Sequence, residues 1–120
     1  MKVHLNEDNL CLRELQTFHR SLDCEKGFDV DMLRNVAYLT EEVGEVVSAI
    51  RSFADADEPS AVEEARIQLG EELADCLAYI LKLANYGSID LQEAYVRKME
   101  RNLARTWHKK QNAAPEQVSL

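Results

Sequence analysis

The chain has 120 residues, 46% of them hydrophobic and 30% charged, with a formal net charge of −8 at pH 7. This length suits a single domain that buries roughly two thirds of the surface of its unfolded chain. Affinity for polymeric nucleic acid depends on cations that neutralise phosphates, so the negative charge speaks against such a partner. The sequence has no run of about 18 apolar residues and its first residues lack the pattern of a signal peptide, so we expect no membrane partner.

Three cysteines are present, Cys11, Cys24 and Cys76. Their number is odd, their spacing is wide and they form no C-x-x-C pair, so the sequence does not indicate a disulfide framework. We expect the thiols to serve as small hydrophobic side chains in a protein of the reducing cytoplasm.

Apolar residues recur at helical spacing in four segments, which predict helices over 7–26, 31–54, 60–86 and 91–107. Residues suited to the N-cap position precede them: Asn6, Asp29 or Asp31, Ser60 with Glu63 as a capping box, and Asp90 with Glu93 as a second one. Gly27 and Gly87 are placed to end the first and third helices. The sequence therefore predicts an all-α, four-helix-type bundle in one domain of residues 1–108, followed by a loose polar tail of residues 109–120.

The second helix carries three acids within five residues, Glu41, Glu42 and Glu45. At 100° per residue its apolar side chains share one arc, which predicts the face toward the core. The members of this arc are Val36, Leu39, Val43, Val46, Val47, Ile50 and Phe53. Glu42 borders the arc and Glu45 lies one step further out, where burial of a charge is costly, so we expect a positive partner there.

The third helix supplies a second acidic pair, Glu72 and Asp75. Asp75 lies in an apolar segment and is predicted to be buried, so it must be paired, protonated or bound to a metal. Both pairs have i, i+3 spacing, so antiparallel packing of the two helices would bring four carboxylates together. The nearby cations, Arg51, Arg66 and Lys82, are placed on other faces. Hard oxygen ligands without Cys or His favour Mg²⁺ or Mn²⁺, and the alternative is a solvated acidic surface.

The fourth helix carries a polar stripe of Lys98, Asn102 and Arg105. These side chains are suited to the outer oxygens of a polyphosphate that is also bound by metal ions. The alternative is a solvated basic face near a helix C-terminus, where the helix dipole favours cations.

Together these residues resemble the MazG-like, all-α nucleoside triphosphate pyrophosphatases. The acidic pattern E-E-x-x-E followed by E-x-x-D is present as Glu41-Glu42-Val43-Gly44-Glu45 and Glu72-Leu73-Ala74-Asp75. The segment Lys98-Met99-Glu100-Arg101-Asn102 is similar to the K-M-x-x-N stretch of that family. The resemblance covers roughly residues 19–105.

The resemblance implies hydrolysis of a nucleoside triphosphate, usually a deoxynucleotide, to the monophosphate and pyrophosphate. Glu42, Glu45, Glu72 and Asp75 match the Mg²⁺ ligands of the family. Glu41 matches the first acid of the motif, and the resemblance implies catalytic roles for Glu41, Glu42 and Glu45 in positioning the ligand or water and in accepting a proton. Metal ions in such a site neutralise the triphosphate and lower the pKa of a water placed in line with the α-phosphorus.

Among dCTP pyrophosphatase relatives, a pocket for the base is lined by residues that match His19, Phe28 and Tyr79. Phe28 replaces an expected Trp, and Ser52 stands roughly where those relatives have a second Trp. The preferred base therefore stays open, and the alternative is that the three side chains belong to the core. The family also implies homodimers or homotetramers.

The leading hypothesis is a cytoplasmic, Mg²⁺-dependent dNTP pyrophosphatase that cleanses the nucleotide pool. One alternative is a non-catalytic acidic helical module that binds a structural cation or an Arg-rich partner. Another is a pyrophosphohydrolase that acts on a different nucleotide, such as phosphoribosyl-ATP.

Overall fold

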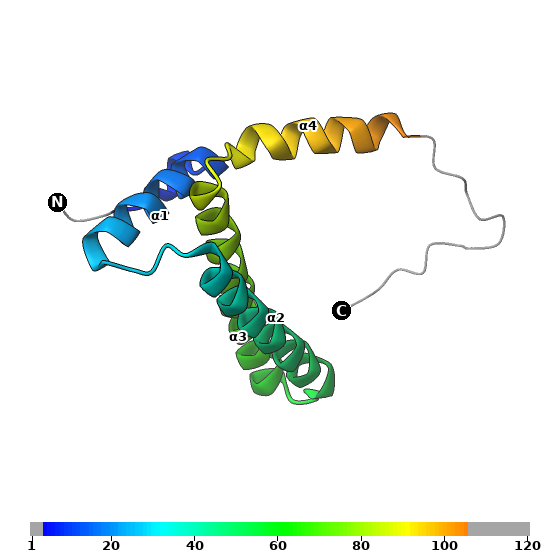
Figure 1. The fold of residues 1–120 in the computed structure, drawn as a ribbon. Coiled ribbons are helices and arrows are strands. Elements are labelled where there is room, and N and C mark those ends of the chain that lie inside the picture. Colours follow the sequence, from blue (N-terminus) through cyan, green and yellow to red (C-terminus); the bar gives the residue numbers. More distant parts are fainter. Residues whose placement is uncertain (1–3, 106–120) are drawn as a thin grey trace.

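The computed structural model describes residues 4–105, and all the regular structure in this range is helical (Figure 1). The elements are a 3₁₀ turn, η1 (Glu7–Asn9), and the helices α1 (Leu12–Lys26), α2 (Met32–Asp55), α3 (Pro59–Tyr86) and α4 (Leu91–Ala104). The predicted all-α class with four helices is confirmed. Trp107, expected at the end of the fourth helix, and the expected tail of residues 109–120 lie outside the described residues.

The two longest helices, α2 and α3, form an antiparallel hairpin joined by a short connector (Figure 1). Small side chains lie at the centre of the packing, because Ala49 of α2 and Ala65 of α3 are both buried. Helix α1 packs against α3, which contains the fully buried Leu81. Within the described range, no helix is both long and apolar enough to cross a membrane.

Three of the predicted helix ends are set by local chemistry. Gly27 ends α1 in the left-handed region at φ 63°, a conformation that glycine adopts without steric cost. The Asp31 carboxylate caps α2 by accepting from the backbone N–H of Arg34 at 2.9 Å. Asp90 caps α4 in the same way, with the N–H of Glu93 at 3.1 Å.

Two predicted helix starts are wrong. Asn6 caps only the η1 turn, accepting from the N–H of Asp8, and α1 begins at Leu12. The expected capping box of Ser60 does not form, because α3 begins one residue earlier at Pro59. The fixed φ of proline suits the first helical position, so the helix begins there without a side-chain cap.

A buried glutamine joins α1 to the connection between α3 and α4. Gln16 donates to Asn85 Oδ1 at 3.1 Å and to the carbonyl of Ile89 at 2.7 Å, and it accepts from the N–H of Leu91 at 3.0 Å. Arg13 of α1 also donates from its Nε to Oδ2 of Asp90, the N-cap of α4, at 2.8 Å. These contacts fix the first turn of α4, and the rest of α4 extends away from the hairpin (Figure 1).

Much of the predicted core arc of α2 is exposed in a single chain. Leu39, Val46 and Phe53 are partly buried, whereas Val47 is 53% exposed. The other exposed apolar side chains of α2 and α3 include Val36, Val43, Ile50, Leu73, Leu77 and Ile80. Helix α4 exposes Tyr95, Val96, Met99 and Leu103, the last of them at 85%. Within residues 4–105, apolar faces of α2, α3 and α4 are therefore left exposed.

Candidate metal centre

Three carboxylates meet across the α2–α3 hairpin. Glu42 of α2 and Glu72 and Asp75 of α3 each offer an oxygen, and these oxygens lie within 4.8 Å of one another. The i, i+3 spacing puts Glu72 and Asp75 on one face of α3, and antiparallel packing places Glu42 opposite them. The structure thus brings together three of the four predicted metal ligands, which we call the acidic cluster.

The burial of the acidic cluster differs from the prediction. Glu42 and Glu72 are partly buried, but Asp75 is exposed. Leu73 and Leu77, on the opposite side of α3, are exposed as well, so the apolar side chains around Asp75 do not bury it within residues 4–105. The prediction of a buried Asp75 is therefore wrong for a single chain.

Burial and repulsion between the carboxylates both act on the acidic cluster. Partial burial raises the pKa of Glu42, and the charge of Asp75 and a hydrogen bond with Glu72 raise it further. Burial also raises the pKa of the Cys76 thiol, and the negative charge of Glu42 raises that pKa further. None of the ion pairs formed within residues 4–105 involves these carboxylates. Hard oxygen donors with excess negative charge fit Mg²⁺ or Mn²⁺.

The other two acids of the first motif lie outside the acidic cluster. Glu45 is exposed one helical turn after Glu42, close enough that its charge also raises the pKa of Glu42. Glu41 is exposed too, and its charge acts on Tyr79, whose pKa is raised mainly by burial. Both acids therefore border the acidic cluster, but neither belongs to the group of carboxylates whose oxygens lie within 4.8 Å of one another.

The structure does not bring the predicted phosphate-binding residues to the acids within one chain. Lys98, Asn102 and Arg105 belong to α4 or its C-cap, and α4 packs chiefly against α1 and extends away from the hairpin (Figure 1). Lys98 is exposed, and Asn102 contacts Met99 of its own helix.

The three predicted base-pocket residues gather around a lysine. Lys82 Nζ lies 5.1 Å from the centroid of the Phe28 ring and 5.3 Å from that of Tyr79. His19 is near enough for the charges of Asp23 and Lys82 to act on it, although burial is the main cause that lowers its pKa. The ring of Tyr79 also lies 6.0 Å from that of Tyr38.

Placing Lys82 on another face of α3 was wrong. Its side chain is only 12% exposed and pairs with Asp23 Oδ1 at 3.2 Å. The second oxygen, Asp23 Oδ2, accepts from the hydroxyl of Tyr86 at 2.5 Å. Asp23 of α1 was not predicted as part of this site. The spacing of Asp75, Tyr79, Lys82 and Tyr86 does show that these four side chains share one stripe along α3, and Asp23 contacts the last two of them.

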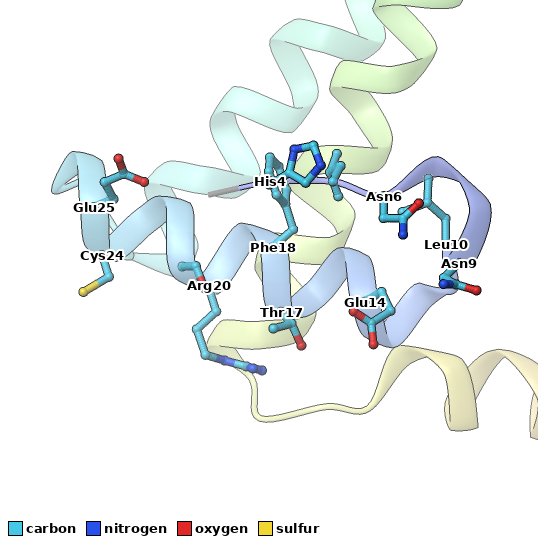
Figure 2. Close-up of a pocket in the computed structure, with 12 residues that line it drawn as sticks. His4, Asn6, Asn9, Leu10, Glu14, Thr17, Phe18, Arg20, Cys24 and Glu25 are labelled. Atoms are coloured by element: carbon cyan, nitrogen blue, oxygen red, sulfur yellow. The ribbon is translucent and has the colours of Figure 1, made fainter. Parts of the chain in front are cut away.

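A separate hollow lies on α1, away from the acidic cluster. It measures about 790 Å³ and is lined by the segment that precedes α1 and by residues such as Phe18 and Cys24 (Figure 2). Figure 2 shows Phe18 reaching from α1 toward His4. Since none of the clustered acids lines it, this hollow is not the candidate metal centre.

Comparison with known families gives one match. No curated protein matches the chain significantly. The family described as the MazG nucleotide pyrophosphohydrolase domain matches residues 31–108, which contain the acidic cluster, Tyr79 and Lys82. This match covers more than half of the sequence and confirms the resemblance. The chain belongs to the MazG nucleotide pyrophosphohydrolase family.

Proposed function

We propose that the protein hydrolyses nucleoside triphosphates, preferably deoxynucleotides, to monophosphates and pyrophosphate with the help of Mg²⁺. The observation that carries this proposal is the acidic cluster, three carboxylate oxygens within 4.8 Å of one another in a chain of the MazG family. The role that fits this activity is cleansing of the cytoplasmic nucleotide pool.

Glu42, Glu72 and Asp75 would hold the metal ion. When bound, Mg²⁺ neutralises phosphate charge and lowers the pKa of a nearby water. Glu45, one turn from Glu42 and outside the acidic cluster, would serve as a further ligand or as the base that takes a proton from water. Glu41 would help to position the ligand or the water. Water oxygen bonds to the α-phosphorus, the bond from that phosphorus to the bridging oxygen breaks, and pyrophosphate leaves.

We also propose that a second copy of the chain covers the exposed apolar faces in a homodimer or homotetramer. The exposed valines of α2 and the 85% exposed Leu103 support this, since soluble monomers rarely expose such continuous apolar faces. Lys98, Asn102 and Arg105 would then contact the phosphates from another copy. Light scattering should report a multiple of the 13.7 kDa chain mass, and a monomer would contradict this arrangement.

A panel of triphosphates with identification of the products tests the activity. The wild-type protein with Mg²⁺ should convert dNTPs to the monophosphate and pyrophosphate, and EDTA should abolish the reaction. Including ribonucleotides and phosphoribosyl-ATP tests the alternative substrate. Release of inorganic phosphate and a diphosphate, or no turnover of any compound, would contradict the proposal.

The matched variants are Glu42→Gln and Glu64→Gln. Glu42 belongs to the acidic cluster, so we expect its loss to lower kcat at least about 10²-fold, as for other groups that stabilise transition-state charge. Glu64 is an exposed acid of α3 outside the acidic cluster, so its variant should retain activity. Equal activity of both variants would contradict the assignment of the acidic cluster as the metal site of the enzyme.

A further inference from the structure

A lysine ammonium lies between aromatic rings next to the acidic cluster. Lys82 Nζ is within 5.3 Å of the ring centroids of both Phe28 and Tyr79, and its side chain is largely shielded from water. A cation over two ring faces is stabilised by their quadrupoles, and this stabilisation grows as water is removed. The two rings and the ammonium therefore form one partly enclosed unit.

An ion pair and a hydrogen bond fix the position of this ammonium. Lys82 Nζ pairs with Asp23 Oδ1 at 3.2 Å, and the hydroxyl of Tyr86 donates to Asp23 Oδ2 at 2.5 Å. An ammonium group has three N–H donors, and the ring faces contact the cation without serving as conventional acceptors. Among the interactions within residues 4–105, Asp23 is its one ion-pair partner. Lys82 thus retains donors for a ligand.

The distance from the acidic cluster suits a nucleotide. Lys82 follows Asp75 by seven residues, which is two helical turns or about 10 Å along the same face of α3. Tyr79 lies between them, and the charges of Glu42 and Asp75 both act on its phenol. A nucleotide whose phosphates are bound at the acidic cluster would extend along this face and place its base at the rings of Phe28 and Tyr79.

We propose that Lys82 selects nucleotides whose base presents a carbonyl oxygen at this point, as uracil, thymine and guanine do, over cytosine and adenine. The proposal rests on the triphosphate hydrolysis proposed above. The ammonium donates to a carbonyl oxygen, whereas the amino group of cytosine or adenine places a donor against a donor. A site built to donate one hydrogen bond discriminates strongly against a substrate that cannot accept it.

The test compares dUTP with dCTP. Uracil has a carbonyl at position 4 and a hydrogen on N3, whereas cytosine has an amino group at position 4 and no hydrogen on N3. We expect wild-type protein to have a kcat/KM at least about 10-fold higher for dUTP. In Lys82→Met, which keeps the length of the side chain without its donors, this ratio should fall toward one, mainly through loss on dUTP. Lys26→Met, at the exposed end of α1, should keep the wild-type ratio.

Removing Lys82 alone leaves the Asp23 carboxylate without its cation, which can unfold the protein. A second variant therefore separates loss of the donor from loss of the fold. Asp23→Asn/Lys82→Met removes both charges and keeps an acceptor for Tyr86. The same loss of the dUTP preference in this folded variant would support the proposal. A wild-type preference for dCTP, or an unchanged ratio in both variants, would overturn it and leave the proposed hydrolysis standing. No pyrophosphate from any triphosphate would overturn both.

Discussion

Two acidic sites lie beside the same stripe of α3, Asp23 of α1 and the acidic cluster, and they differ in how their negative charge is compensated. Asp23 is 7% exposed, and its partners are built into the chain: the ammonium of Lys82 and the hydroxyl of Tyr86. The acidic cluster of Glu42, Glu72 and Asp75 is more open, and its three acids have no ion pair within the described residues. The charge of Asp23 is compensated within the chain, whereas no ion pair among residues 4–105 compensates the charge of the acidic cluster.

Under the proposed function, this contrast separates a charge that stabilises the fold from charges that bind the metal ion. A charge buried in the chain is costly unless a partner comes with it, so Asp23 is retained together with Lys82. Burial raises the pKa of Glu42, and the neighbouring carboxylates of Asp75 and Glu72 raise it further. This arrangement is unfavourable for folding but suits the binding of a divalent cation. Breaking one member of each group should therefore have different consequences.

The largest effect on stability is expected from Asp23→Ala. The change leaves the ammonium of Lys82 and the hydroxyl of Tyr86 without their shared acceptor in a poorly hydrated place. We expect the free energy of unfolding to fall by about 3 kcal/mol, the lower end for breaking a buried ion pair. Urea denaturation measures this change. Asp57→Ala, in the exposed connector between α2 and α3, is the control and should stay within about 0.5 kcal/mol of wild type.

A smaller effect of opposite sign is expected from Asp75→Asn without metal. The neutral side chain keeps the shape of Asp75 and relieves its repulsion with Glu72, three residues earlier on the same helix. We expect the free energy of unfolding to rise by about 0.2–0.5 kcal/mol in EDTA. A clear fall in stability would mean that Asp75 is a structural acid like Asp23, and would remove the contrast between the two groups.

Local patterns in the sequence predicted the helices and part of the acidic cluster. Asp31, Asp90 and Gly27 act within one turn of their own backbone, so spacing alone located these helix ends. The i, i+3 spacing and antiparallel pairing of two long helices sufficed to bring Glu42 to Asp75. Ser60 failed as a cap because Pro59 competes for the start of the same helix.

Contacts between distant segments could not be predicted in this way. The pairing of Asp23 with Lys82 depends on how α1 packs against α3, which helical periodicity does not specify. The burial of Asp75 was predicted from its apolar neighbours, yet periodicity shows only that a face is apolar and not which element covers it. The exposed Val47 and Leu77 illustrate the same point.

Calorimetric titration with Mg²⁺ tests the central claim that the acidic cluster binds the metal and the Asp23 group does not. The comparison uses wild type, Asp75→Asn and Asp23→Asn, and the last two each replace one carboxylate by an amide of equal size. We predict that wild type and Asp23→Asn bind Mg²⁺ with similar affinity, whereas Asp75→Asn binds at least about 10-fold more weakly. Unchanged binding in Asp75→Asn, or a loss confined to Asp23→Asn, would contradict the assignment of Glu42, Glu72 and Asp75 as the metal centre.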